Sequence, residues 1–115
     1  MDISLRIEDH NFILKLKGDY DASASQKLAT ALEEGVRSFC SNIILDLAEL
    51  KYITTTGQRT LVSYLNKIQK LDMQLILCQA KPDVEYSLKE SGLIRLFKIA
   101  SSIREAKAAS TPFAV

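Results

Sequence analysis

The sequence predicts an α/β fold: an N-terminal β-hairpin, followed by helices and strands that alternate along the chain. Three observations predict it. Residues 3–17 alternate apolar and polar side chains around an Asp-His-Asn turn, as the strands of a hairpin do. Residues 43–47 form a short, mostly apolar run, and a segment of helical period follows Gly57. Strands that alternate with helices pair in parallel through right-handed crossovers. We therefore expect a mixed, mostly parallel sheet with helices packed against it.

The first helix is predicted over residues 22–38, after a short acidic loop at 19–21. Either Asp21 or Ser23 could cap it, because both side chains accept hydrogen bonds from the free N–H groups of a first turn. The helical spacing of the apolar residues gives the expected buried positions, which are Leu28, Ala29, Leu32 and Val36. The helix is expected to pack on the sheet through this face.

The strand at 43–47 and the helix after Gly57 are expected to form the centre of the fold. The strand is apolar on both faces, which is typical of a strand covered by helices on both sides. In the helix, apolar residues recur every three or four positions, at Leu61, Leu65, Ile68 and Leu71. This spacing indicates one buried face, and Asp72 is expected to end the helix.

The C-terminal half is predicted to contain two further strands and two further helices. A strand over 74–79 is followed by a helix over 82–90, with proline in its first turn and glycine beyond its end. A last short strand over 96–99 leads to a helix over 103–109, which Ser102 could cap.

Size and composition indicate one small domain. The chain has 115 residues, of which residues 1–110 are predicted to form the domain and residues 111–115 a frayed tail. The formal net charge of +1 does not indicate binding to nucleic acid or acidic lipid. No apolar stretch reaches the length of a membrane span, and the first residues, which lack a basic region followed by a long apolar segment, lead us to expect no secretory signal. We therefore expect a cytoplasmic protein in which Cys40 and Cys78 are free thiols.

A run of hydroxyl side chains, Thr54-Thr55-Thr56, lies between the central strand and Gly57. The first turn of a helix has unpaired N–H groups and a partial positive charge. A threonine there can cap the helix, which is a purely structural role. If it is phosphorylated, it places about −1.5 to −2 charges at the same helix end, which is a regulatory role. The spacing of the residues leaves both interpretations open.

Catalysis is not expected. The sequence has no glycine-rich phosphate loop, no Ser/His/Asp or Cys/His set at a plausible separation, and no metal-ligand spacing. The single histidine, His10, lies in the predicted hairpin turn and is expected to be solvated. We therefore predict a binding module without catalytic residues, metal or cofactor.

Three motifs in the right order resemble one family. Leu45-Asp46-Leu47, with Leu50 after it, precedes the hydroxyl-rich tetrad that ends at Gly57. Gly18-Asp19-Tyr20-Asp21 follows the second predicted strand, and Ser91-Gly92-Leu93 closely precedes Leu96-Phe97-Lys98-Ile99. Together with the order of elements, these motifs resemble the STAS domain of anti-sigma-factor antagonists over essentially the whole chain. The resemblance implies a STAS fold.

The resemblance also implies a switch. The usual tetrad of the family is Asp-Ser-Ser-Gly or Asp-Ser-Thr-Gly, and the hydroxyl directly after the aspartate is phosphorylated by an anti-sigma factor that is also a serine/threonine kinase. The unphosphorylated antagonist binds this kinase and releases the sigma factor. Carried over position by position, the aspartate falls on Thr54, the phosphoacceptor on Thr55 and the second hydroxyl on Thr56. In this scheme the partner binds ATP, and a phosphatase is a further candidate partner.

This chain departs from the family pattern at two places. Thr54 replaces the carboxylate, so a neutral hydroxyl must take over its contribution to capping or recognition. Gln58 and Arg59 replace the usual apolar and small residues, and Arg59 could pair with a phosphate on Thr55. The predicted partner-binding surface comprises Asp19, Asp21, Thr54, Thr55, Thr56, Gly57, Gln58 and Arg59, with Thr55 as the phosphorylation site and Thr56 as the second choice.

The two aspartates and the function each have an alternative interpretation. Asp19 and Asp21 could instead only form a turn and cap the next helix. The protein could be an unphosphorylated STAS scaffold or adaptor in a signalling or transport assembly, with purely structural threonines. It could also sense a small ligand or nucleotide at the same loops, because STAS-like folds are similar to ligand-binding α/β folds.

Overall fold

A computed structural model describes residues 1–21 and 23–109. Its centre is a five-stranded sheet in the order β1-β2-β3-β4-β5. The strands are β1 (Asp2–Glu8), β2 (Asn11–Gly18), β3 (Asn42–Leu50), β4 (Gln74–Cys78) and β5 (Lys98–Ala100). β1 pairs with β2 antiparallel, and all other neighbours are parallel. The predicted mixed, mostly parallel sheet is therefore confirmed. The predicted frayed tail at 111–115 lies outside the described residues.

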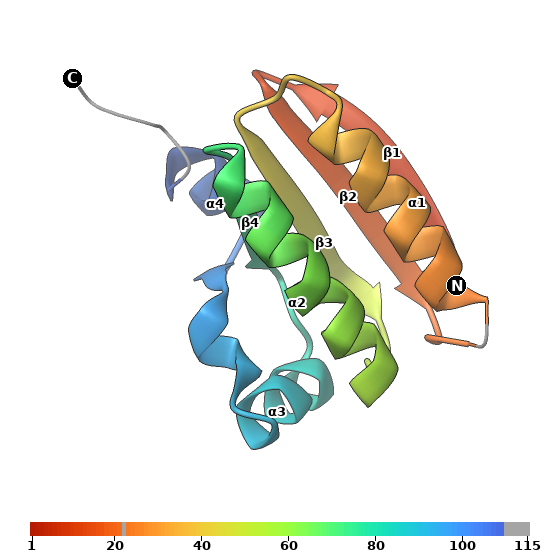
Figure 1. Ribbon diagram of the computed structural model, residues 1–115. Coiled ribbons are helices and arrows are strands. Elements are labelled where there is room, and N and C mark those ends of the chain that lie inside the picture. Colours follow the sequence, from red (N-terminus) through yellow and green to blue (C-terminus); the bar gives the residue numbers. More distant parts are fainter. Residues whose placement is uncertain (22, 110–115) are drawn as a thin grey trace.

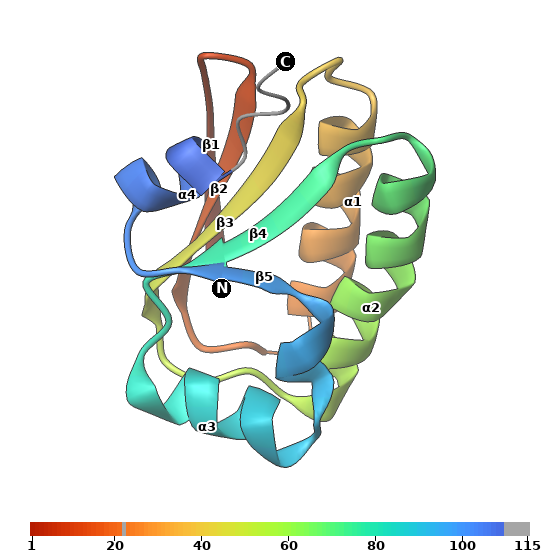
Figure 2. The same cartoon turned by 90° about the vertical axis from the view of Figure 1, so that its left-hand side faces the viewer.

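The helices cover both faces of the sheet. α1 (Ala24–Val36) and α2 (Thr55–Lys70) lie side by side on one face, and α4 (Ile103–Ala109) lies on the other, as Figures 1 and 2 show. α3 (Pro82–Glu90) lies beyond the end of the sheet to which the parallel strands point, and a short 3-10 helix, η1 (Leu93–Leu96), connects it to β5. This arrangement brings the beginnings of α2 and α3 to the same end of the molecule.

The hairpin turn consists of Asp9 and His10 alone. Both residues have positive φ angles, 50° and 65°, which is the backbone of a type I′ turn. Asn11 holds the turn, because its side-chain amide donates hydrogen bonds to the carbonyl oxygens of Glu8 and Asp9 at 3.1 and 3.0 Å. His10 is exposed, as expected.

β3 is buried on both faces, as its sequence predicts. Ile43 and Leu45 face α1 and α2 in the larger core cluster, while Ile44 faces α4 in the smaller one. α1 packs closely against the sheet because Gly35 faces it: a Cβ at this position would lie 2.8 Å from the Ile43 Cδ1 and 3.0 Å from the Phe12 ring. Cys40 and Cys78 are both buried and free, which confirms that prediction.

Several predicted boundaries and burial positions of α1 and α2 were wrong. α1 ends at Val36, and Ala29 and Val36 are only partly buried, because the helix turns Ala24 and Gly35 toward the sheet instead. Leu71, predicted to face inward, is 51% exposed because α2 ends at Lys70 and Leu71 lies beyond its last turn.

The strands also differ from their predicted bounds. β3 extends beyond the predicted 43–47 at both ends. Gln79 is not part of β4, since its φ of 59° leaves the strand conformation and its side-chain amide donates to the Asp46 carboxylate at 2.8 Å. Leu96 belongs to η1, so the last strand begins later than predicted.

Candidate functional site

The threonine run begins α2. Thr54 is the N-cap residue, with an extended backbone (φ −78°, ψ 167°), and its side-chain oxygen accepts a hydrogen bond from the Gly57 N–H at 3.1 Å. This is the expected geometry for a threonine that satisfies one of the free N–H groups of a first turn. The capping role considered for the run is therefore performed by Thr54.

Thr55 and Thr56 are the first two residues of the helix, and both are exposed. The first turn of α2 contains no acidic residue. Its positive end is therefore not neutralised by a carboxylate of the same turn. Arg59 is also exposed and lies four residues after Thr55, which places both on the same side of the helix.

Gly57 lets this turn approach the loop that follows β2. A Cβ at this position would lie 2.8 Å from two ring atoms of Tyr20 and 2.9 Å from the Ile53 Cγ1. The Tyr20 ring is buried, and its hydroxyl is 2.7 Å from the Ser25 hydroxyl on α1. Tyr20 thus fixes the 19–21 loop beside α2. This role of Tyr20 could not be predicted from the sequence, although Tyr20 belongs to the Gly18-Asp19-Tyr20-Asp21 motif.

Asp21 organises its own loop, while Asp19 is exposed. The Asp21 carboxylate accepts hydrogen bonds from the Met1 amino group at 2.9 Å and from the Ser23 hydroxyl and N–H at 2.8 and 3.1 Å. These donors, the Met1 amino group foremost, lower the pKa of Asp21 to about 2. Ser23, at the N-cap position, makes no side-chain capping bond, so Asp21 supplies the side-chain acceptor at the start of α1.

The first turn of α2 separates two surface hollows. One, of about 390 Å³, is lined by Tyr20, Asp21, Ser25, Thr54 and Thr56. The other, of about 360 Å³, is lined by Thr55, Gln58, Arg59, Val62, Ser63, Ser91 and Leu93. The structure thus brings most of the predicted surface together, with Thr55 on one flank and Asp21 on the other.

Gln58, which was predicted to belong to the partner-binding surface, has a buried side chain. Its side-chain oxygen accepts a hydrogen bond from the Ser91 hydroxyl at 2.6 Å. This contact joins the start of α2 to the end of α3, so that Ser91 and Leu93 line the same hollow as Thr55. Sequence reasoning placed Ser91 in a family motif but did not connect it to the threonines.

The described residues contain no group of three or more potential metal ligands. Within the same residues, the helices are all too short or too polar to cross a membrane.

The sheet, the order of elements and a capped, hydroxyl-bearing helix start define the class of protein. The STAS domain model matches residues 2–106, and the chain belongs to this family. The chain is similar to BtrV of Bordetella bronchiseptica (strain ATCC BAA-588 / NCTC 13252 / RB50), which is named as an anti-sigma factor antagonist. The two are 29% identical over 110 residues, which cover 96% of this chain and 94% of BtrV.

Solved structures agree on the fold. The anti-sigma factor antagonist SpoIIAA in its unphosphorylated form superposes with a TM-score of 0.82 at 16% identity, covering 99% of this chain and 100% of SpoIIAA. The phosphorylated form of SpoIIAA, a Bacillus cell fate determinant, gives a TM-score of 0.71 at 16% identity, covering 94% and 98% of the two chains.

Proposed function

We propose that this protein is an anti-sigma-factor antagonist that docks on a kinase-type anti-sigma factor through the first turn of α2, and that phosphorylation of Thr55 weakens the docking. One observation carries the proposal: Thr55 is exposed immediately after a capped helix start, in a chain of the STAS family. The similarity to BtrV and SpoIIAA, proteins named as anti-sigma factor antagonists, supports the choice of partner.

Thr55 is the best acceptor of the three threonines. Thr54 is partly buried, and its oxygen is already engaged as the cap of the helix. Thr55 lines the hollow that also contains Arg59 and Leu93, where a partner could contact both a hydroxyl and an apolar surface. Thr56 is exposed as well, but it lines the other hollow beside Asp21, whose carboxylate would repel a phosphate. Thr56 therefore remains the second choice.

The proposed switch is electrostatic. A phosphate on Thr55 adds about −1.5 to −2 charges to a surface that otherwise presents a hydroxyl. In the free protein, the N–H groups of the first turn and the Arg59 guanidinium can stabilise these charges. In a complex, the dianion must lose water or face the partner's own groups, and each 1.4 kcal/mol of such cost weakens binding about tenfold. The partner supplies ATP for the transfer, and a phosphatase would restore the binding form.

Binding and phosphorylation should be measured with the cognate anti-sigma factor. We expect Thr55→Glu to bind at least about tenfold more weakly than the parent in titration calorimetry. Thr55→Ala should bind but incorporate no phosphate at this site, as read by mass spectrometry. Thr60→Ala, one turn further along α2, is the matched control, and Thr56→Ala tests the second choice.

Two results would contradict this proposal. The first is a Thr55→Glu variant that binds as tightly as the parent. The second is phosphorylation of Thr55→Ala at the parental stoichiometry. A third result would identify a STAS scaffold instead: the protein binds the active kinase, but none of its threonines becomes phosphorylated.

A further inference from the structure

The outer strand β1 carries a row of apolar residues, Ile3, Leu5 and Ile7, that the rest of the described chain covers only in part. Ile3, Leu5 and Ile7 pair with Leu16, Leu14 and Phe12 of β2, and so lie on the sheet face that α1 covers. Leu5 is nevertheless 45% exposed and Ile7 56% exposed, because α1 does not reach across the sheet edge. Apolar residues exposed in a row on an edge strand are typical of an interface.

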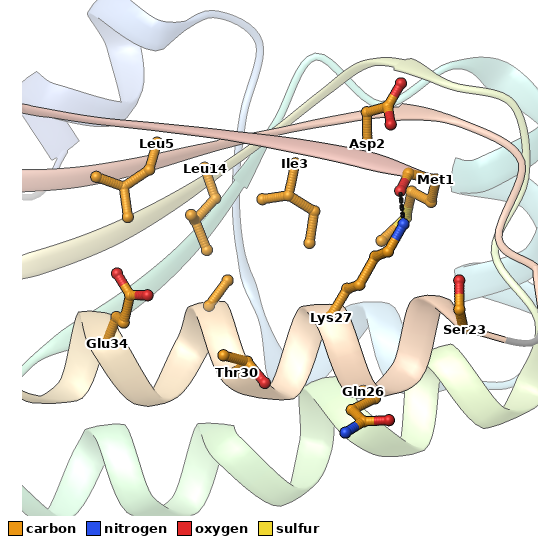
Figure 3. A pocket seen from close by; sticks show the side chains of 11 residues that line it. Met1, Asp2, Ile3, Leu5, Leu14, Ser23, Gln26, Lys27, Thr30 and Glu34 are labelled. Atoms are coloured by element: carbon orange, nitrogen blue, oxygen red, sulfur yellow. Dashed lines mark hydrogen bonds between the residues drawn. The ribbon is translucent and has the colours of Figure 1, made fainter.

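A groove of about 830 Å³ runs between α1 and two residues of this row, Ile3 and Leu5. Figure 3 shows Ile3, Leu5 and Leu14 pointing toward the helix, whereas the Asp2 side chain points away from it. β1 therefore has an apolar face toward the groove and a polar face on the other side, where Ser4 and Arg6 alternate with the apolar residues.

The backbone of β1 is suited to pairing with another strand. In a hairpin with a two-residue turn, the flanking residues, here Glu8 and Asn11, form a hydrogen-bonded pair. Going back along β1 from Glu8, every second residue (Arg6, Ser4 and Asp2) also points its N–H and C=O toward β2. Ile3, Leu5 and Ile7 therefore present theirs to the outer edge, and β1 ends the sheet among the described residues.

We propose that β1 pairs antiparallel with β1 of a second copy of this chain, with Ser4 on the two-fold axis. This register places Ile3 opposite Leu5 of the second copy in hydrogen-bonded pairs, and Asp2 opposite Arg6 in the closer, non-hydrogen-bonded pairs. By symmetry each pairing occurs twice. Charges of opposite sign then face each other on the polar face, and the apolar rows join above the two grooves.

The other registers are less favourable for identifiable reasons. Centred on Leu5, the pairing would set Asp2 against Glu8, and centred on Arg6 it would set two guanidinium groups against each other. A shift by a single residue would place the apolar row of one copy beside the polar face of the other. Of the registers compared, the one centred on Ser4 matches both charge and hydropathy.

This interface goes beyond the proposed function and does not depend on it. The parallel strands point toward the helix end that carries Thr55, and a two-fold axis through the β1 pair reverses their direction in the second copy (Figure 1). The two docking surfaces would therefore lie at opposite ends of a continuous sheet, both accessible to partners.

Cysteine cross-linking tests the register. A Ser4→Cys variant places two thiols opposite each other at a Cα separation of about 4.5 Å, within the range of a disulfide. We expect it to form a covalent dimer under mild oxidation, while the parent, whose two cysteines are buried, does not. Leu5→Cys is the matched control, because it would cross-link only in the register centred on Leu5. Equal cross-linking of both variants would overturn the proposed register.

Charge reversal tests the pairing without covalent trapping. We expect the parent to show a monomer–dimer equilibrium in sedimentation velocity. D2R alone or R6D alone should weaken the dimer about tenfold, since each change affects two pairs. The double variant should recover to within a few-fold of the parent, and reversal of the exposed Asp83 on α3 is the control. A parent that stays monomeric up to millimolar concentration, or a double variant as weak as the singles, would overturn the proposal.

Discussion

Two helices begin at the same end of the sheet, and their first turns differ in charge. α2 follows β3, and α3 follows β4, which runs parallel to it. The first turn of α3 contains two carboxylates, Asp83 and Glu85, whereas the first turn of α2 contains none. The positive end of α3 is thus partly neutralised by its own side chains, and that of α2 is not.

The two helix starts also differ in how they are held. α3 begins with proline after Lys81, which makes no side-chain capping bond. α2 begins with the Thr54 cap, and its third residue, Gly57, packs on the Tyr20 ring. The corresponding third residue of α3 is Val84, an ordinary core residue. The start of α3 therefore carries charged side chains and an ordinary core contact, whereas the start of α2 presents exposed hydroxyls on an uncharged turn that is fixed by close packing.

The largest expected effect comes from filling the space at Gly57. Gly57→Ala adds a Cβ within 2.8 Å of the Tyr20 ring, so the start of α2 or the 19–21 loop must move. We expect the free energy of unfolding to fall by about 1–3 kcal/mol, measured by urea denaturation. Thr56→Ala, at the exposed neighbouring position, is the control and should change stability by less than about 0.5 kcal/mol. A Gly57→Ala variant as stable as the parent would show that the close packing is not required.

Much of the fold could be predicted from the sequence because its signals are local. The double-sided apolar run of β3 placed that strand at the centre, and the Asp-His turn placed the hairpin. The ends of helices and strands were predicted less well. The spacing of apolar residues shows which side chains can be buried, but not at which residue the backbone stops being helical or extended. Leu71 and Leu96 both fit the apolar pattern, yet one lies beyond the end of α2 and the other in a 3-10 turn.

In the candidate site too, contacts within one turn could be predicted from the sequence, whereas contacts between distant segments could not. The Thr54 cap could be predicted, because a cap joins residues three apart in one turn. The contact of Ser91 with Gln58 could not, because it joins residues 33 positions apart and depends on how the turn after α3 folds. The packing of Tyr20 on Gly57 is also a contact between distant segments, visible only once the loop and helix are placed together.

A smaller effect is expected from removing the cap. Thr54→Ala leaves the Gly57 N–H without its side-chain acceptor, and we expect a loss of about 1 kcal/mol in the free energy of unfolding. Lys81→Ala, at the N-cap of α3, is the matched control and should cost much less, because no side-chain bond is lost. Thermal or urea unfolding of the two variants measures the difference directly. Equal losses at both positions would mean that the two helix starts are held in the same way.

The smallest expected effect is the pH dependence contributed by Asp21. Its pKa, lowered to about 2 from an ordinary value of 3.8, means that its contribution to stability is present above about pH 4. It is lost as the pH falls through about 2, because the protonated carboxyl no longer pairs with the Met1 amino group and accepts more weakly from Ser23. Asp21→Asn should therefore lose stability at neutral pH and show a shallower decline between pH 4 and 2. Asp72→Asn, in the exposed turn after α2, is the control, and its stability should decline with falling pH as that of the parent does. An Asp21 carboxyl signal that titrates near 4 in NMR would show that these hydrogen bonds do not hold the loop beside α2. The starts of α2 and α3 would then differ less in how firmly they are held.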